Sequence, residues 1–403
     1  MIRLLELRNT YKWGGGPDKT ILLSAERHDP KRVAVVVAYL RPQNDHEFRI
    51  GERARAQRLT YYEIPERGKL DLRVVRVVRE IVRQRRIDII HAHDFRSDLV
   101  AYLVGLSLGR RRPILMSTAH AWVMAGRKGD VYRHLDLLLM RRFDQLIAVS
   151  NATKAQMVAG GVRAERIAVV HNGIDTEAWS REHADGGLAA EWKLPRGGPV
   201  IGYVGRIMPE KNLETWLRVA ASVASSVQQA RFVLVGDGRD GRTERELKAL
   251  ARGLGIEAST TFAGYRSDLL SVYTTFDVFM MTSRREGLPN SILEAMALGL
   301  PVVTTDVAGA KELVDHGVTG FVRPQDDASG LAAAATALAG DPALRRRMGA
   351  AGRLRVEKEF SFTDRLARIE DLYEQVVGKR AVPDIPRRAV QRSLGPQARQ
   401  DVQ

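Results

Sequence analysis

Residues 283–303 read SRREGLPNSILEAMALGLPVV, and their pattern predicts a loop, a buried helix and the start of a strand. Pro289 suits the first helical position, where its missing N–H costs nothing, and Gly299 followed by Pro301 marks the end of the helix. The helix between them is apolar nearly all round, as expected of a helix inside a core. We therefore expect one unit of an α/β fold here.

Two carboxylates interrupt this apolar stretch, Glu286 before the helix and Glu294 within it. Helical side chains lean toward the N-terminus, so Glu294 is expected to point at the same mouth that Glu286 lines. The free amides around Leu288, Asn290 and Ser291 suit an anion. Amides for a phosphate beside carboxylates for hydroxyl groups fit a phosphorylated sugar. The alternative is that Glu294 lies on an ordinary solvated face of the helix.

The same alternation of short apolar runs and helical stretches extends along most of the chain. It covers residues 1–175, is lost in residues 176–198, and returns in residues 199–360. Such alternation predicts βαβ units and parallel sheets with helices on both faces, and the interruption predicts a linker. The expected fold class is α/β, with two tandem doubly wound Rossmann-like domains that face each other across a cleft, where such sheets bind ligands.

The composition is that of a globular protein. Of the 403 residues, 44% are hydrophobic and 28% charged, and none is cysteine, which excludes disulfides, thiolate metal sites and a cysteine nucleophile. We find neither the pattern of a signal peptide nor a run of about 18 apolar residues that would span a membrane. A cytoplasmic location is expected.

The net charge of +15 is concentrated in the first half of the chain. Residues 1–196 hold 35 Lys and Arg against 23 Asp and Glu, and a predicted helix at 71–86 is rich in arginine. A basic surface suggests an anionic partner, such as nucleic acid, anionic lipid or a phosphorylated substrate, although an arginine-rich genome would give the same excess. The face of this helix that is expected to be buried carries Leu72, Val75, Val78 and Val82.

Three further strand ends in the second half carry residues that suit a nucleotide. The turn VGRIMPEKN at 204–212 supplies Arg206 and Lys211, two cations that suit a diphosphate. The strand end LVGDG at 234–238 offers Gly236 for close backbone approach. Tyr265 and Arg266 follow the next strand, where a base could lie, although Tyr265 could also cap the core. Each signal is weak alone, and their convergence on one crevice favours a site.

In this order, the motifs resemble the retaining glycosyltransferases of the GT-B fold, family 4, over roughly residues 1–378. The most specific marks are the Glu286-x7-Glu294 spacing, the VGR…EKN turn and VVHNGID at 169–175. DIIHAHD, STAHAW and the glycine-rich loop YKWGGGPDKT add to the resemblance. The chain departs from the family at Ala121, where glycine is common, and at VAGAKELV (307–314), which replaces a Gly-Gly and Pro-Glu pattern.

The resemblance implies a role for each domain. Residues 1–175 would bind the acceptor and residues 199–360 the donor. A helix at 361–378 would cross back to the first domain, ahead of a disordered basic tail at 379–403, whose Pro-, Arg- and Gln-rich composition lacks periodicity.

The resemblance also implies roles for single residues. Arg206 and Lys211 would hold the diphosphate, Glu294 the ribose and Glu286 the hydroxyls of the donor sugar. His120 would contact the transferred sugar near the reacting carbon, which makes His120, Glu286, Arg206 and Lys211 the expected catalytic residues. The other expected donor-binding residues are Gly15, Gly16, Gly236, Tyr265, Arg266, Gly287, Leu288 and Asn290.

These roles predict a hexosyltransferase that moves a sugar, with retention, from a UDP- or GDP-sugar to an acceptor hydroxyl in polysaccharide, lipopolysaccharide or glycolipid synthesis. We expect no metal and no other cofactor, because fixed cations and helix amides lie where the leaving diphosphate gains charge. His91, His93 and Asp94 could bind a metal but lack a clear third ligand, and neutral histidines that cap strand ends are the simpler interpretation.

The expected partners are a nucleotide sugar and a sugar or lipid-linked acceptor, with peripheral contact between the basic first domain and the inner face of an anionic membrane. Two alternatives remain, a GT-B-like sugar-nucleotide epimerase and a basic nucleic-acid-binding protein. The charge alone suggests the second, and no nucleic-acid motif supports it, so no nucleic acid is expected. A NAD-dependent dehydrogenase is disfavoured because GGGPDKT lacks the G-x-G-x-x-G spacing.

Overall fold

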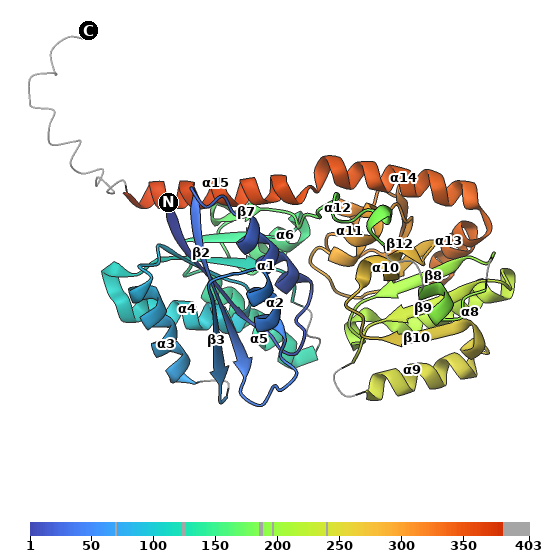
Figure 1. The fold of residues 1–403 in the computed structure, drawn as a ribbon, viewed down its shortest axis with the longest axis horizontal. Helices are drawn as coiled ribbons and strands as arrows, with labels where there is room; N and C mark the ends of the chain where they lie inside the picture. Colours follow the sequence, from blue (N-terminus) through green and yellow to red (C-terminus); the bar gives the residue numbers. More distant parts are fainter. Residues whose placement is uncertain (69–70, 123–125, 185–187, 196, 239–240, 382–403) are drawn as a thin grey trace, which may run out of the picture.

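The computed structural model describes residues 1–68, 71–122, 126–184, 188–195, 197–238 and 241–381. Figure 1 shows two α/β bodies side by side, with the last two helices of the chain following one another along the same edge, one on each body. Each body has its own parallel sheet with helices on both faces, so the expected fold class is confirmed.

The first domain is built on a sheet of 7 strands in the order β3-β2-β1-β4-β5-β6-β7. Every neighbouring pair is parallel, and the central strands are buried on both faces, as such sheets require. The order reverses beside β1, which is the position where doubly wound sheets bind ligands. The strands are β1 (Ile2–Asn9), β2 (Val33–Pro42), β3 (Tyr61–Glu66), β4 (Ile89–Ala92), β5 (Ile114–Ala119), β6 (Gln145–Ala148) and β7 (Ile167–Val169).

Several helices of the first domain start at polar caps. Asp94 accepts from two backbone amides at the start of α4, and Ser150 accepts from Thr153 N at the start of α6. Helix α5 begins at Gly126. The helices are α1 (Gly16–Arg27), α2 (Ile50–Ala56), α3 (Leu72–Gln84), α4 (Phe95–Leu108), α5 (Gly126–Met140) and α6 (Asn151–Ala159), with short 3-10 turns at Gly109–Arg111 and Ala164–Arg166.

The buried face of α3 differs from the expected one. Leu72 is 72% exposed, because it is the first residue of the helix and its face turns away from the sheet. The buried residues follow the spacing i, i+4, i+7 and i+8, which rotates the apolar stripe relative to the expectation. They are Val74, Val78, Ile81 and Val82.

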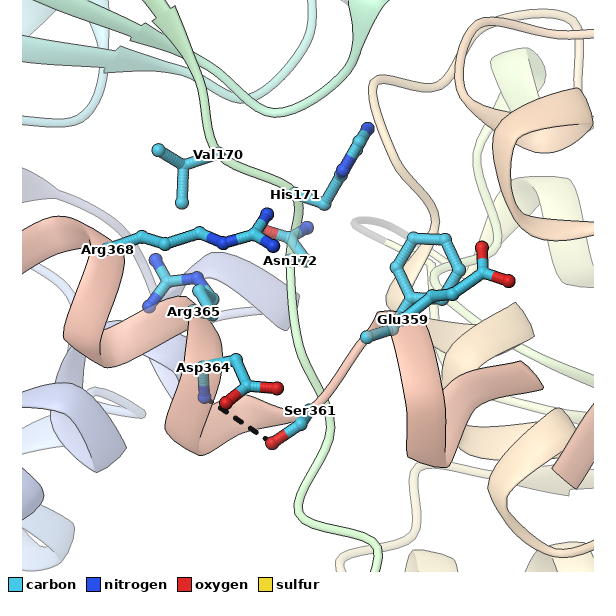
Figure 2. A pocket seen from close by; sticks show the side chains of 9 residues that line it. Val170, His171, Asn172, Glu359, Ser361, Asp364, Arg365 and Arg368 are labelled. Carbon is cyan, nitrogen blue, oxygen red and sulfur yellow. Dashed lines mark hydrogen bonds between the residues drawn. The ribbon is translucent and has the colours of Figure 1, made fainter. Parts of the chain in front are cut away.

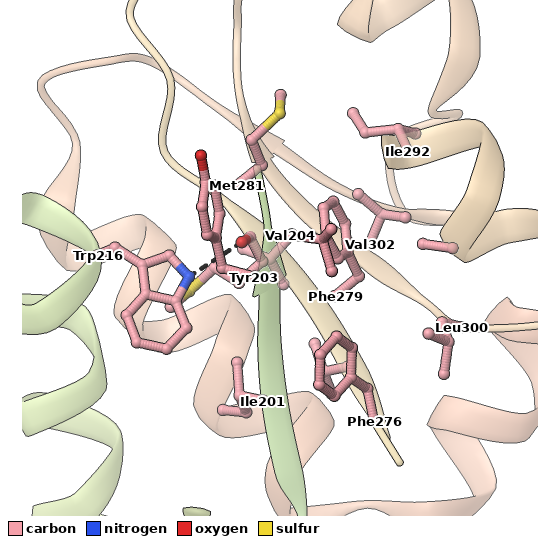
Figure 3. Packing of buried hydrophobic residues seen from close by; sticks show 14 of the residues in the cluster. Ile201, Tyr203, Val204, Trp216, Phe276, Phe279, Met281, Ile292, Leu300 and Val302 are labelled. Atoms are coloured by element: carbon pink, nitrogen blue, oxygen red, sulfur yellow. Dashed lines mark hydrogen bonds between the residues drawn. The ribbon is translucent and has the colours of Figure 1, made fainter. Parts of the chain in front are cut away.

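The second domain is built on a parallel sheet of 6 strands in the order β10-β9-β8-β11-β12-β13. Its core surrounds the fully buried Trp216, whose indole Nε1 donates to Met280 O at 2.9 Å (Figure 3). The strands are β8 (Val200–Val204), β9 (Arg231–Val235), β10 (Thr260–Gly264), β11 (Val278–Met281), β12 (Val302–Thr305) and β13 (Gly320–Arg323). The helices are α8 (Leu213–Ser226), α9 (Arg242–Gly253), α10 (Leu269–Thr274), α11 (Asn290–Ala297), α12 (Ala310–Leu313), α13 (Ala328–Gly340) and α14 (Pro342–Glu359), with 3-10 turns at Pro209–Lys211 and Glu257–Ser259.

The chain passes between the domains twice, and the two passages lie side by side (Figure 2). Ile174 N donates to Phe360 O at 2.9 Å, and Phe362 N donates to Ile174 O at 3.1 Å. Gly173 is required at this contact, since a Cβ there would stand 2.8 Å from Phe362 Cα. Beyond the first passage, the expected linker contains the 3-10 turn Arg181–His183 and the short helix α7 (Leu188–Glu191).

Helix α15 (Phe362–Ala381) crosses back onto the first sheet, as expected (Figure 1). Its apolar face buries Ile369, Tyr373 and Val376 against β1 and its neighbours. Arg32 holds the outer face through ion pairs with three acids of the helix. The helix continues to Ala381, so residues 379–381, expected in a disordered tail, are helical, and the rest of that tail lies outside the described residues. Among the described residues, none of the helices combines the length and apolar character needed to cross a bilayer.

Candidate active site between the two domains

The carboxyl ends of both sheets open on a cavity of about 800 Å³ between the domains. Cavities at this end of doubly wound sheets, and of this size, are common ligand sites. Every site residue expected from the sequence lines this cavity, although what each residue binds stays a prediction. They are Gly15, Gly16, His120, Arg206, Lys211, Gly236, Tyr265, Arg266, Glu286, Gly287, Leu288, Asn290 and Glu294.

Helix α11 is buried, as the apolar stretch indicated, and its polar end faces the cavity. Pro289 is the N-cap rather than the first helical residue, with φ −72° and ψ 112°, so the helix begins at Asn290. Glu294 is only 5% exposed, so the alternative of a solvated face is wrong. The start of the helix, with its free amides and positive dipole end, therefore opens into the cavity.

Two residues from different domains hold Glu294. Tyr273 OH donates to its Oε2 at 2.8 Å, and Lys19 Nζ donates to its Oε1 at 3.0 Å. Burial and the adjacent carboxylate raise the pKa of Tyr273 well above its usual value, so the phenol remains a donor at neutral pH. Glu294 is thus fixed as an acceptor at the boundary between the domains.

Lys211 and Glu286 form an ion pair inside the cavity. Lys211 Nζ lies 2.6 Å from Glu286 Oε1, and both side chains are largely buried. The cation expected to bind a diphosphate therefore stands next to the carboxylate expected to bind sugar hydroxyls. This spacing matches a sugar phosphate, whose hydroxyls and phosphate oxygens are also neighbours.

Arg206 reaches across the cleft from the end of β8. Its Nη1 donates to Tyr11 OH, in the glycine-rich loop of the first domain, at 3.0 Å. Beside it, Gly236 has φ 140°, and a Cβ there would stand 1.9 Å from Gly205 O. The ends of β8 and β9 therefore require glycine, and they leave the guanidinium on an open surface of the cavity.

The glycine-rich loop is held in shape by a buried acid. Asp18 is fully buried and accepts from Gly15 N at 2.6 Å and from Arg8 Nε at 2.7 Å. This fixes the start of α1 against α11, where a Cβ on Gly16 would stand 2.9 Å from Asn290 Nδ2. The expected roles of Gly15 and Gly16 thus have a rigid support that sequence reasoning missed.

Aromatic rings also meet across the cleft. Trp13 stacks on Tyr265 with ring centroids 4.9 Å apart and an interplanar angle of 21°. Tyr265 therefore does not cap the core of its own domain, which was the alternative. Arg266 pairs with Asp268 at 2.6 Å and with Glu191 at 2.9 Å, so its charge is already balanced by carboxylates.

Close backbone contacts join the second domain to His120. A Cβ on Gly287 would stand 1.5 Å from His120 O, and one on Gly309 would stand 2.3 Å from Gly287 O. Gly309 also has φ 72°, which favours glycine. The VAGAKELV segment, where the chain departs from the family, thus packs Gly309 directly behind the donor loop.

His120 is a neutral residue in the first-domain wall of the cavity. Burial and the nearby Arg8 hold the pKa of His120 well below its usual value. Its Nε2 contacts His93 Nδ1 at 3.2 Å, and its Nδ1 has no hydrogen-bond partner within the part of the chain that the structure describes. His120 is therefore suited to hydrogen bonding and not to carrying a charge.

The possible metal ligands differ from those expected. Asp94 caps α4 instead of joining His91 and His93. Glu6 takes its place, and the ligand atoms of Glu6, His91 and His93 lie within 4.8 Å of one another, all buried. Of this group, His93 also lines the cavity, next to His120.

Sequence reasoning also missed a pair of buried acids beside the first-domain wall. Asp136 lines the cavity and accepts from Trp122 Nε1 at 2.8 Å. Burial raises the pKa of Asp136 to about 6, and burial together with Asp136 raises that of Asp98 well above its usual value. Only the contact between α4 and α5 brings the two acids together, so no local sequence signal marked them.

Two family models follow the two halves of the chain. Residues 14–178 match Glycosyltransferase Family 4, and residues 188–355 match Glycosyl transferases group 1. The chain is 29% identical over 274 residues to the capsular polysaccharide biosynthesis glycosyltransferase CapM of Staphylococcus aureus, covering 65% of this chain and 70% of CapM. It is 26% identical over 310 residues to the UDP-Gal:alpha-D-GlcNAc-diphosphoundecaprenol alpha-1,3-galactosyltransferase of Escherichia coli, covering 74% of this chain and 79% of that enzyme.

Solved structures share the fold. HepE of Anabaena, in complex with UDP and glucose, superposes with a TM-score of 0.81 at 22% identity, covering 93% of this chain and 100% of HepE. Sucrose-phosphate synthase of Thermosynechococcus elongatus gives a TM-score of 0.78 at 19% identity, covering 94% of this chain and 100% of the synthase. These comparisons do not favour the epimerase or the nucleic-acid-binding alternative. The chain belongs to glycosyltransferase family 4, and it is a nucleotide-sugar-dependent hexosyltransferase of the GT-B fold.

Proposed function

We propose that the enzyme transfers a hexose, with retention of configuration, from a UDP- or GDP-sugar to the hydroxyl of a lipid-linked acceptor in polysaccharide or glycolipid assembly. The observation that carries this proposal is the composition of the cavity wall. Two carboxylates, two cations and the start of a buried helix stand together on the donor side, within reach of the glycine-rich loop.

In the proposed reaction, the bond between the anomeric carbon and the diphosphate oxygen breaks, and the acceptor oxygen bonds to the same face of that carbon. The acceptor proton passes to the departing phosphate oxygen. Negative charge grows on the diphosphate, so Arg206, Lys211 and the α11 amides stabilise the transition state more than the ground state. Determination of the anomeric configuration by NMR tests the stereochemistry, and an inverted product would contradict it.

We propose that Glu294 accepts hydrogen bonds from the ribose and Glu286 from the sugar. Both are fixed before binding, Glu294 by Tyr273 and Glu286 by Lys211. A site built to accept hydroxyl hydrogen bonds rejects analogues that lack them, because the buried acceptors would be left unpaired. We therefore expect 2′-deoxy nucleotides to bind at least about 10-fold more weakly than ribonucleotides.

The proposed reaction needs no divalent metal, because cationic side chains already stand where a metal would neutralise the diphosphate. The group with metal-ligand spacing, Glu6, His91 and His93, belongs to the first domain and is buried there. We expect activity to persist in EDTA. Loss of activity in EDTA that magnesium restores would contradict metal independence.

The first domain supports a proposal about the acceptor. The Escherichia coli relative is named for a diphosphoundecaprenol acceptor, which is a lipid with an anionic head group. Here Leu72 and Val77 are 72% and 44% exposed on α3 among exposed arginines, a mixed surface that suits an anionic bilayer. We propose that α3 contacts the inner face of the cytoplasmic membrane.

Vesicle binding tests this contact. Wild type should bind vesicles of phosphatidylglycerol and phosphatidylcholine, and binding should fall as salt rises. Charge reversal on α3 by the double substitution Arg76→Glu and Arg83→Glu should abolish vesicle binding. The matched double substitution Arg346→Glu and Arg347→Glu on α14 should leave vesicle binding unchanged. Absence of binding at low salt, or equal loss in both variants, would contradict the proposal.

A donor panel tests the core of the proposed function. UDP-glucose, UDP-galactose, UDP-N-acetylglucosamine and GDP-mannose are incubated with the enzyme and a lipid-linked diphosphate sugar, and release of nucleoside diphosphate is measured. We expect one nucleotide series to be turned over. Turnover of none would contradict the proposed function.

A further inference from the structure

A chain of three residues, of which Glu6 and His93 are buried and His120 is half-buried, leads to the first-domain wall of the cavity, and the proposed chemistry uses only its last member. Glu6 lies in β1, His93 follows β4 and His120 follows β5, which are neighbouring strands of one sheet. Glu6 Oε2 lies 2.5 Å from His93 Nε2, and His93 Nδ1 lies 3.2 Å from His120 Nε2. The chain therefore leads from the sheet interior to the cavity.

The charge state of this chain follows from its surroundings. Burial alone would raise the pKa of Glu6, but the two histidines beside it hold it well below its usual value. His93 is buried as well, and the Arg8 guanidinium, which donates to His93 O at 3.1 Å, disfavours a second positive charge on its ring. The arrangement therefore places an ionised carboxylate against a neutral imidazole.

These charges fix the positions of the protons. A carboxylate only accepts hydrogen bonds, so the proton of neutral His93 lies on Nε2 and its Nδ1 is a bare acceptor. His120 must then donate from Nε2 to that acceptor. In a neutral ring the other nitrogen has no proton, so His120 Nδ1 is an acceptor, and no described residue donates to it.

We propose that Glu6 and His93 are positioning residues that hold His120 in its Nε2–H tautomer, so that Nδ1 accepts a hydrogen bond from a hydroxyl of the sugar being transferred. The tautomer itself follows from contacts within this chain. The partner of Nδ1 rests on the proposed function, because it requires a sugar beside His120.

This arrangement suits a reaction in which positive charge develops on the sugar ring. A protonated His120 would repel that charge, whereas a neutral acceptor does not. The Glu6 carboxylate at the far end of the chain polarises both imidazoles and makes Nδ1 a better acceptor. Replacement of Glu6 should therefore change the hydrogen-bonding sense of His120 without touching the sugar.

Surrounding contacts hold the chain in register. The backbone of His93 is fixed by Arg8, which donates to its carbonyl at 3.1 Å, and by Ser97 Oγ, which accepts from its N–H at 3.1 Å. Glu6 Oε1 lies 3.4 Å from Tyr373 OH on α15. The helix that crosses back from the second domain thus supports the carboxylate.

A buried metal is the competing explanation for these residues, since Glu6, His91 and His93 have metal-ligand spacing. However, both nitrogens of His91 already face hydroxyl groups, Tyr373 OH and Thr118 Oγ1, each at 2.7 Å. Glu6 and His93 contact each other directly at hydrogen-bond distance. Protons therefore satisfy these polar atoms.

The test is ¹⁵N NMR of the full-length protein with labelled histidine, which distinguishes protonated from bare ring nitrogens. The His120 signals are assigned by comparison with His120→Asn. Wild type should show His120 with Nε2 protonated and Nδ1 bare. A His120 ring protonated on Nδ1, or one mole of bound metal per mole of protein by mass spectrometry, would overturn the proposal without any variant.

Two substitutions at Glu6 sharpen the test. Glu6→Met removes the acceptor at similar size, so the proton of His93 should move to Nδ1 and that of His120 to its own Nδ1. Glu6→Gln keeps an acceptor oxygen and should keep the wild-type tautomer. The control is Glu370→Met. It also removes a buried carboxylate, one on α15 that contacts His28 and not His93. An unchanged His120 in folded Glu6→Met would overturn the proposal.

Kinetics then separate the relay from the proposed function. With whichever donor of the panel is turned over, Glu6→Met should lower kcat by about 10-fold or more, with Glu6→Gln between it and wild type. A normal kcat beside the swapped tautomer would reject the hydrogen bond to the sugar. If no donor of the panel is turned over, the proposed function fails while NMR still decides the tautomer.

Discussion

The two walls of the cleft are built in different ways. On the second-domain wall, Glu286 and Glu294 belong to one short stretch, and Lys211 comes from the neighbouring strand end. On the first-domain wall, the groups that matter are joined only through distant contacts, such as the chain from Glu6 to His120. The residues of the donor wall can therefore be recognised from a local sequence motif. The contacts on the opposite wall form only when distant strands come together in the sheet.

The largest expected effect tests the second-domain wall. Lys211→Met removes a cation from the leaving diphosphate and leaves Glu286 unpaired, so kcat should fall by about 100-fold to 1,000-fold. Steady-state kinetics measures it. Lys248→Met, which removes an exposed cation paired with Glu244, is the matched control and should behave like wild type. Equal kinetics in the two variants would contradict the assigned role of Lys211.

The next effect concerns the contact between the walls. A Cβ on Gly287 would overlap His120 O, 1.5 Å away, so Gly287→Ala should force the domains apart and reduce kcat by about 100-fold. Among the described residues, no atom beyond the neighbouring backbone stands within 4 Å of a Cβ on Gly253, a helical position where alanine should be tolerated. Similar kcat values for the two alanine variants would show that this contact is not needed for activity.

A smaller effect concerns the buried acids of the first domain. The folded-state pKa of Asp136, about 6, lies above the ordinary 3.8, so the fold favours the protonated carboxyl. The stability gained from protonation is complete below pH 3.8 and is lost as pH rises through about 6. Asp136→Asn cannot ionise, so it should be more stable than wild type by about 3 kcal/mol at pH 8.

The pH dependence is the critical part of that prediction. The stability difference between Asp136→Asn and wild type should shrink toward zero near pH 4, as measured by urea unfolding at both pH values. Asp130→Asn, at an exposed position of the same helix, controls for loss of a surface charge. A constant difference across pH would show that the gain comes from another source.

The smallest expected effect tests the aromatic contact across the cleft. Trp13→Ala removes the stack on Tyr265, and the KM for the donor should change by about 2-fold to 10-fold while kcat is preserved. Trp13→Phe keeps an aromatic face and should be close to wild type. A large fall in kcat in Trp13→Ala would instead place Trp13 at the reacting centre.

Much of the fold could be predicted because its signals are local. The alternation of strands and helices, the buried α11 and the return of the C-terminal helix all hold in the structure. The prediction of which α3 residues are buried was wrong for Leu72, because this residue lies in the first turn, where the sheet no longer covers the helix. The prediction ended the C-terminal helix at residue 378, whereas α15 continues to Ala381. Amino-acid composition does not mark the residue at which a helix ends.

Site residues could be predicted from the sequence only where they lie in a motif formed by one strand end and the loop that follows it. Sequence placed Glu294 and Arg206 on the cavity, but not Lys19 or Tyr11, which contact them from the other domain. Such pairs depend on the relative position of two domains, which leaves no pattern in either segment. The aromatic residue beside the glycine run, Trp13, was a signal that could have been used.

The most direct test of the central claim, that Glu294 and its surroundings bind a nucleoside diphosphate, is calorimetry with UDP and GDP on wild type and Glu294→Gln. One nucleotide should bind wild type, and Glu294→Gln should bind it at least about 10-fold more weakly, because a buried acceptor of two hydroxyl hydrogen bonds loses its charge. Glu257→Gln, at an exposed ion pair with Arg252, should leave the Kd unchanged. Equal affinity in wild type and Glu294→Gln, or no binding of either nucleotide, would contradict the account.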